Sequence, residues 1–218
     1  EINVSVWNGL MFINFNKRCN SLESIYEKLE KRINKRNFSS YQFYKRDSYN
    51  ISCNWKIYMD NYLEGLHIPI VHPELNKTIN YKSYKTETHD QFSLQWCSID
   101  PQLNPYKNDS SEDLIAYYVT IFPNVILNIA PGRLQTNIVE PIDEKNCSVH
   151  FDYYFEQIDE KQIQKDLDFS DIIQREDIEI CESVQASYEA KGFKSGIISK
   201  RYESGILHFH SRLKEILL

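Results

Sequence analysis

Two histidines, His67 and His72, lie five residues apart in a segment that also carries acids. On a helix, Asp60, Glu64 and His67 would point in nearly the same direction, since they occupy positions i, i+4 and i+7. Pro69 prevents such a helix from continuing undisturbed, so the chain has to bend before His72. Two imidazoles separated by a bend can converge on one point. Imidazoles that converge beside carboxylates favour a bound metal ion, and these ligands suit iron or zinc.

A site of two histidines and one carboxylate needs a further acid from elsewhere in the chain. Helical spacing predicts an amphipathic helix over residues 170–188. Asp177 lies on its apolar face, whereas Glu176, Glu179 and Glu182 lie off that face and can be solvated. A buried carboxylate is costly unless it is paired or bound to a metal. Asp177 is therefore the predicted third ligand. The apolar face itself consists of Ile173, Ile180, Cys181, Val184 and Tyr188.

The elements that must position these side chains follow from the spacing of apolar residues. Residues 4–15 are β-rich and are interrupted by Asn8-Gly9, a strong hairpin signal. Further strands are predicted at 92–98, 116–122, 125–130, 134–140 and 148–156, and helices at 22–32, 55–66, 169–189 and 202–217. The rest of the polar stretch 74–113 is predicted to form loops. Strands joined by short turns and followed by helices indicate an α+β fold with an antiparallel sheet.

Composition narrows the class of protein. A chain of 218 residues is most naturally one domain. The net charge of −6, with dispersed lysines and arginines, argues against a nucleic-acid partner. No apolar run is long enough to span a bilayer, so no membrane association is expected. The five widely spaced cysteines favour a reducing environment and predict a cytoplasmic protein.

Residues 54–73 resemble the iron-binding motif of the Rieske-type non-heme iron oxygenases, in the alpha (large) subunit. Residues 6–15, 122–128 and 174–185 are similar to other parts of that subunit, as is the last helix around His208-Phe209-His210. The resemblance implies a helix-grip (START/SRPBCC-like) fold, with a curved antiparallel sheet around a long C-terminal helix. It also implies that residues 1–218 form a single catalytic domain with mononuclear iron.

The resemblance assigns roles to the residues of the motif. It implies that His67, His72 and Asp177 hold Fe(2+). It implies that Glu64 links a ligand histidine to a Rieske histidine of the neighbouring subunit and carries the electron across. Asn61 matches a position that lines the active site. For Asp60, we expect a supporting hydrogen bond at the site.

The family's Rieske [2Fe-2S] cluster needs two cysteines and two histidines, arranged as Cys-x-His and Cys-x-x-His pairs. None of Cys19, Cys53, Cys97, Cys147 and Cys181 forms such a pair with a histidine. We therefore interpret the chain as a catalytic domain from a longer protein, without its N-terminal Rieske domain, and expect it to be inactive alone. The resemblance implies electrons from NAD(P)H through a separate reductase or ferredoxin, O₂ as co-substrate, and a homotrimer.

The predicted activity is an oxidation with O₂, either hydroxylation of an aromatic ring or oxidation of a quaternary amine, and the sequence leaves this choice open. Choline and betaine-type monooxygenases have a similar motif context. Two alternatives remain, a zinc-dependent hydrolase and a non-enzymatic ligand-binding protein of helix-grip fold. His208 and His210 are predicted to be structural. Asn128, Tyr117 and Phe209 are candidates for lining the pocket.

Overall fold

The computed structural model describes residues 2–16, 21–33, 36–101, 114–191 and 195–217. Its centre is a seven-stranded sheet in the order β3-β9-β8-β7-β6-β5-β4, in which all neighbouring strands run antiparallel. The strands are β3 (Gln42–Ile51), β4 (Lys85–Thr88), β5 (Phe92–Ser98), β6 (Ile115–Ile121), β7 (Val125–Ala130), β8 (Arg133–Pro141) and β9 (Cys147–Phe155). A separate hairpin consists of β1 (Asn3–Trp7) and β2 (Leu10–Asn14).

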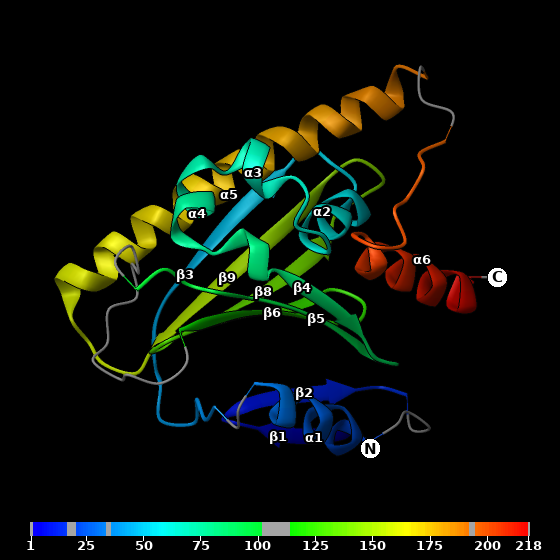
Figure 1. Cartoon of the computed structure of the whole chain (residues 1–218). Helices are drawn as coiled ribbons and strands as arrows, with labels where there is room; N and C mark the ends of the chain where they lie inside the picture. Colours follow the sequence, from blue (N-terminus) through cyan, green and yellow to red (C-terminus); the bar gives the residue numbers. More distant parts are fainter. Residues whose placement is uncertain (1, 17–20, 34–35, 102–113, 192–194, 218) are drawn as a thin grey trace.

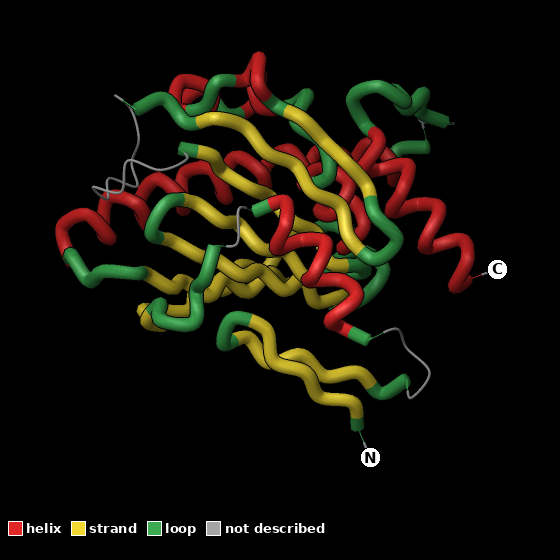
Figure 2. The backbone as a smooth tube through the Cα atoms, turned by 60° about the horizontal axis from the view of Figure 1, so that its bottom comes forward, coloured by secondary structure: helices red, strands yellow, loops and turns green. Residues whose placement is uncertain are grey.

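Most of the helices lie on one side of this sheet and the hairpin lies on the other (Figure 1). The long helix α5 crosses the first side, together with the shorter helices α2, α3 and α4, and α6 lies at one end. The hairpin and α1 lie on the other side and share an apolar core with the large sheet (Figure 2). The helices are α1 (Leu22–Arg32), α2 (Trp55–Tyr62), α3 (Ile68–Val71), α4 (Pro73–Thr78), α5 (Glu160–Glu189) and α6 (Ser204–Leu217), with a 3-10 turn η1 (Tyr81–Ser83).

Each side of the sheet has its own apolar core, because successive side chains of a strand point to opposite faces. Leu94, Val119, Leu127 and Leu134 pack with residues of the hairpin and α1. On the other side, alternate residues of β7, β8 and β9 pack against α2, α5 and α6. The α5 side also carries many buried polar groups, which line the cavity described below.

The predicted α+β fold with an antiparallel sheet is confirmed. Helix 22–32 and strands 92–98 and 125–130 have the predicted limits. The hairpin signal is confirmed as well, since Asn8 (φ 50°) and Gly9 (φ 83°) both lie in the left-handed region that a two-residue turn of this kind requires.

Several elements differ from the sequence prediction. The sequence prediction missed strands β3 and β4 and helix α4. Most of their residues are polar and at least partly exposed, so the regular spacing of the few buried residues is hard to recognise. Helix α5 begins at Glu160, where Asp159 accepts hydrogen bonds from the amides of Lys161 and Gln162, both at 3.1 Å. Its last turns extend past the core, so Val184 and Tyr188 are exposed and do not belong to the predicted inner face.

Two further observations bear on the composition. The four cysteines among the described residues are buried and free, while Cys19 lies outside them. None of the described helices is long and apolar enough to cross a membrane.

Candidate metal centre

The chain leaves helix α2 before it reaches the histidines. The helix ends at Tyr62, four residues earlier than predicted. The Glu64 carboxylate then accepts hydrogen bonds from the backbone amides of Leu66 and His67, which offers the chain an alternative to another helical turn. The expectation that Asp60, Glu64 and His67 share one helix face is therefore wrong.

The sequence predicted a bend at Pro69, but the chain instead leaves the helical conformation before His67 and again at His72. Pro69 lies in the first turn of α3, where its missing amide hydrogen has no cost, and Pro73 opens α4 in the same way. His67 thus directly precedes α3 and His72 directly follows it. Their ring centroids are 5.0 Å apart and the ring planes differ by 77°. The predicted convergence of the two imidazoles is present.

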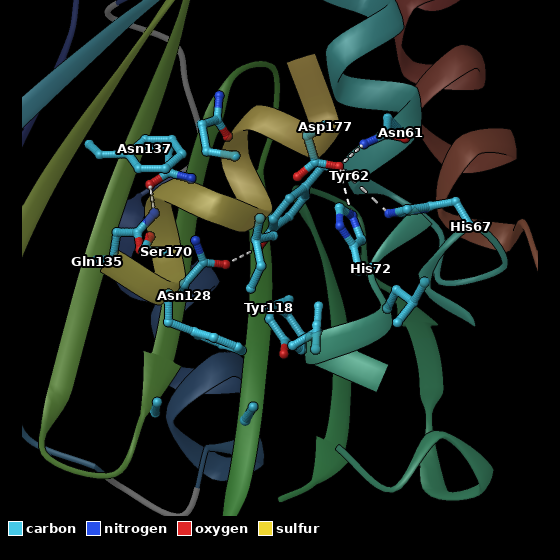
Figure 3. A pocket seen from close by; sticks show the side chains of 18 of the residues that line it. Asn61, Tyr62, His67, His72, Tyr118, Asn128, Gln135, Asn137, Ser170 and Asp177 are labelled. Atoms are coloured by element: carbon cyan, nitrogen blue, oxygen red, sulfur yellow. Dashed lines mark hydrogen bonds and ion pairs between the residues drawn. The ribbon is translucent and has the colours of Figure 1, made fainter. Parts of the chain in front are cut away.

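Asp177 of α5 faces both rings (Figure 3). Its Oδ1 lies 3.0 Å from Nε2 of His72 and 3.8 Å from Nε2 of His67. One ligand atom from each of the three residues lies within 4.8 Å of the other two. His72 is 1% exposed, whereas His67 and Asp177 are partly exposed. The three residues named from sequence therefore form one compact group that could hold a metal ion.

A carboxylate faces the other nitrogen of each ring. Oε1 of Glu64 is 2.5 Å from Nδ1 of His67, and Oε2 of Glu176 is 2.7 Å from Nδ1 of His72. An ionised carboxylate only accepts hydrogen bonds, so each Nδ1 donates to its carboxylate, and Nε2 of a neutral ring would then offer its lone pair to a metal ion. Glu176 was expected to lie where it can be solvated, and its side chain is 27% exposed, but its contact with His72 was not foreseen. Helical periodicity places it off the apolar stripe, but only the docking of α5 shows that His72 lies there.

This arrangement concentrates negative charge around two imidazoles. Burial alone would lower the pKa of His72, but Asp177 and Glu176 outweigh it and raise the pKa above its ordinary value. In the Nδ1–H tautomer, Nε2 of His72 and Oδ1 of Asp177 would both be acceptors at 3.0 Å. Two acceptors this close require a positive charge between them, either a proton or a metal ion.

Of the two other predicted site residues, Asn61 contacts the metal-ligand group and Asp60 does not. Asn61 lines the cavity and donates a hydrogen bond from Nδ2 to Oδ1 of Asp177 at 2.6 Å, which fixes that carboxylate. Asp60 points away and accepts hydrogen bonds from Nε2 of His210, at 2.9 Å to each oxygen. The expected hydrogen bond of Asp60 at the site is therefore absent. The same contact provides a partner for His210, in agreement with its predicted structural role.

The metal-ligand group opens into a cavity with about 120 Å³ of water-accessible space. Six aromatic side chains contribute to its lining: Tyr58, Tyr62, Tyr84, Tyr118, Phe151 and Phe169. Burial raises the pKa of Tyr58, Tyr62 and Tyr84 well above the usual value, so these phenols stay neutral. Their hydroxyls donate to side-chain amides, as from Tyr62 to Oδ1 of Asn128 at 2.7 Å. The cavity therefore presents neutral aromatic rings.

The end of the cavity away from the histidines is polar. Figure 3 places Gln135, Asn137 and Ser170 there, with Asn128, Tyr62 and Tyr118 between them and the metal-ligand group.

Of the three pocket candidates named from sequence, Asn128 lines the cavity. Tyr117 packs in the apolar core on the other side of the sheet, and Phe209 packs edge to face on Trp55, so these two candidates belong to the core. The alternation of polar and apolar residues along β8 was the available signal for Gln135 and Asn137.

Comparison with known families gives a match over most of the chain. The model for the ring hydroxylating alpha subunit (catalytic domain) matches residues 38–218. The chloroplastic choline monooxygenase of Arabidopsis thaliana is 34% identical over 177 residues, which cover 77% of this chain and 40% of that protein. The oxygenase subunit of carnitine monooxygenase from Escherichia coli (strain K12) is 29% identical over 178 residues, covering 75% of this chain and 46% of that protein. The chain thus spans less than half the length of these curated relatives.

Solved structures share the fold. A quaternary ammonium Rieske monooxygenase, studied for carnitine oxidation by gut microbiota and for inter-subunit electron transfer, superimposes with a TM-score of 0.82 at 22% identity. The match covers 98% of this chain and 61% of that chain.

Proposed function

Because the chain belongs to the ring hydroxylating alpha subunit family, whose catalytic domain it matches over residues 38–218, we propose that it is the iron-binding domain of an oxygenase that oxidises a small quaternary ammonium compound. The observation that carries this proposal is the group formed by His67, His72 and Asp177. Both of its imidazoles have Nδ1 held by a carboxylate and Nε2 directed at the third ligand.

These residues fit a mononuclear iron(II) centre. Two imidazole nitrogens and one carboxylate on one side of an ion leave its remaining positions open, as in the facial triad of non-heme iron oxygenases. Glu64 and Glu176 would keep the two rings oriented, and carboxylates in this position also raise the basicity of the ligand nitrogens. Asn61 would hold Asp177. Iron(II) bound there would supply the capacity to activate O₂, which the side chains themselves lack.

The cavity supports a small cationic substrate. Water-accessible space of about 120 Å³ has room for on the order of ten water-sized groups, which suits a compact molecule better than a fused aromatic system. Neutral aromatic rings attract quaternary ammonium groups through cation–π contacts, and such cages are a common way of binding them. The acids at the metal end add electrostatic attraction. The relatives named as choline and carnitine monooxygenases agree with this substrate class.

The electrons would come from outside this domain. We propose that NAD(P)H supplies them through a reductase or ferredoxin and a Rieske [2Fe-2S] cluster, carried by an N-terminal domain of the whole protein, in a homotrimer. Glu64 is suited to pass them on, because its carboxylate contacts His67 while 11% of its side chain stays exposed. In this domain alone, turnover would be limited by electron supply.

The metal proposal can be tested by substituting the acid that faces both rings. Asp177→Ala should remove most of the bound iron, measured by elemental analysis, and abolish substrate oxidation. Glu176→Gln should weaken iron binding less, by about 10–100-fold, because it leaves all three ligands in place. Asp171→Ala changes an exposed acid of the same helix and serves as the control. Full iron retention in Asp177→Ala would contradict the assignment, and zinc in the purified protein would favour a zinc-dependent hydrolase.

The role of Glu64 needs a different measurement. Glu64→Gln keeps an oxygen that can accept from Nδ1 of His67, so the whole protein should retain its iron and its affinity for substrate. Turnover driven by NAD(P)H should nevertheless fall sharply, because the amide cannot carry the charge. Unimpaired turnover of this variant would show that the carboxylate is not needed for electron transfer.

A further inference from the structure

The two ends of the cavity have opposite hydrogen-bonding character. At the metal end, the charged groups are carboxylates, which only accept hydrogen bonds. At the far end, the acceptor oxygens are already used within the protein. Oε1 of Gln135 accepts from Nη2 of Arg133 and from Oγ of Ser170 (3.4 Å), and Oδ1 of Asn137 accepts from Nε2 of Gln135 at 2.7 Å. This chain of amides leaves Nδ2 of Asn137 as its terminal donor.

Gln174 provides a second, independent observation. Its side chain lines the cavity and is 2% exposed. Oε1 accepts a hydrogen bond from the hydroxyl of Tyr58 at 2.8 Å, whereas the buried Nε2 has no partner among the described residues. An unsatisfied buried donor destabilises the folded protein, and such a group in a cavity wall calls for an acceptor from a ligand.

Arg133 adds a cation behind these amides. It lines the cavity and forms an ion pair with the buried Asp166, which does not belong to the lining, at 3.1 Å between Nε and Oδ2. The pair is formally neutral, so the far end recognises a ligand by directed hydrogen-bond donors rather than by net charge. The guanidinium is the partner that faces the cavity side.

We propose that the substrate is a zwitterion, a trimethylammonium compound with a carboxylate at its other end, and that Gln174, Asn137 and Arg133 bind that carboxylate. The proposal rests on the proposed function and makes it more specific. A carboxylate has two oxygens and about four acceptor sites, so it can satisfy all of these donors at once. The single hydroxyl of choline offers fewer acceptor sites than a carboxylate, and its own hydrogen would meet acceptor oxygens that are already used within the protein, which disfavours it.

The experiment compares ligands that differ at only one end. Calorimetric titrations of the iron-loaded full chain, without O₂, would use L-carnitine, its methyl ester and choline. L-carnitine should bind at least about tenfold more tightly than either of the others, a difference of about 1.4 kcal/mol. The ester keeps the cation and loses the anion, so the comparison needs no variant protein.

Variants then locate the carboxylate. Gln174→Leu should reduce the affinity for L-carnitine by about tenfold and remove its advantage over the methyl ester. The matched control Gln164→Leu, at an exposed position of the same helix, should bind like the wild type. Equal affinity of the wild type for L-carnitine and its ester, or tighter binding of choline, would overturn the zwitterion proposal and leave a quaternary ammonium site standing. Binding of none of the three compounds would overturn both proposals.

Discussion

The two faces of the seven-stranded sheet are built from the same strands but bury different kinds of side chain. On the side of the hairpin and α1, Leu127, Ile129 and Leu134 belong to an apolar core. On the side of α5, the next residues along the same strands are Asn128, Arg133 and Gln135, which are polar and line a cavity. One face is stabilised by burial of apolar surface. The other face buries polar groups, which lowers the stability of the fold but provides hydrogen-bonding groups for a ligand.

The two faces should therefore differ in how well they tolerate substitutions. An apolar core loses stability when volume is removed, and we expect that loss to leave the metal-ligand group on the opposite face unchanged. Buried polar groups depend on their partners, and removing one partner leaves the other uncompensated. The following predictions separate the two cases, from the largest expected effect to the smallest.

Arg133→Met should have the largest effect, on the polar face. It leaves Asp166 buried without its cation, and breaking a buried ion pair in this way costs about 3–5 kcal/mol in the free energy of unfolding. Urea denaturation measures this loss. The double variant Arg133→Met with Asp166→Leu should recover most of it, because it removes the uncompensated charge. A loss below about 1 kcal/mol in the single variant would mean that solvent reaches Asp166.

Leu127→Ala tests the apolar face. The side chain is fully buried, and its truncation should lower the free energy of unfolding by about 2–5 kcal/mol. Iron content and ligand affinity at a temperature where the variant is folded should not change, because the side chain points away from the cavity. Ile129→Val, a smaller truncation in the same core, should cost about 0.5–1.5 kcal/mol. Weaker iron binding in either variant would show that the two faces are coupled.

The polar face should also respond to pH. Burial raises the pKa of Asp166 to about 6, although Arg133 acts in the opposite direction. The folded protein therefore binds this proton more tightly than the unfolded chain. As pH rises from about 4 to 6, the contribution of Asp166 to the free energy of unfolding should fall by about 3 kcal/mol and then stay constant. Denaturation at several pH values measures it as the difference between wild type and Asp166→Asn. A difference independent of pH would contradict the raised pKa.

The smallest effect should come from the rim of the apolar face. Arg32 of α1 forms two hydrogen bonds with Glu87 of β4, at 2.6 and 2.8 Å, in a partly exposed position. Arg32→Met should therefore lower the free energy of unfolding by no more than about 1 kcal/mol, and by less in high salt. A larger loss, or one that salt does not reduce, would assign Arg32 a packing role against Trp96, which its guanidinium covers at 5.1 Å.

The sequence alone determined the residues that short-range rules control. The convergence of His67 and His72 was predicted from their spacing around Pro69, but the proline acts by opening the short helix α3 between them rather than by bending the chain. Asp177 followed from helical periodicity, since a single helix decides which of its residues share a face. The hairpin at Asn8-Gly9 followed from the conformations that these two residues tolerate.

Only the tertiary structure decided which groups meet across elements. Glu176 looks solvent-facing on its own helix, and its contact with His72 depends on how α5 docks against the segment around α3. Asp60 belongs to the motif in sequence, yet it pairs with His210 from the last helix, 150 residues away. The side of the sheet reached by Tyr117 or Gln135 depends on strand register, where a shift of one residue reverses every side chain. These contacts join distant segments, so local periodicity carries no information about them.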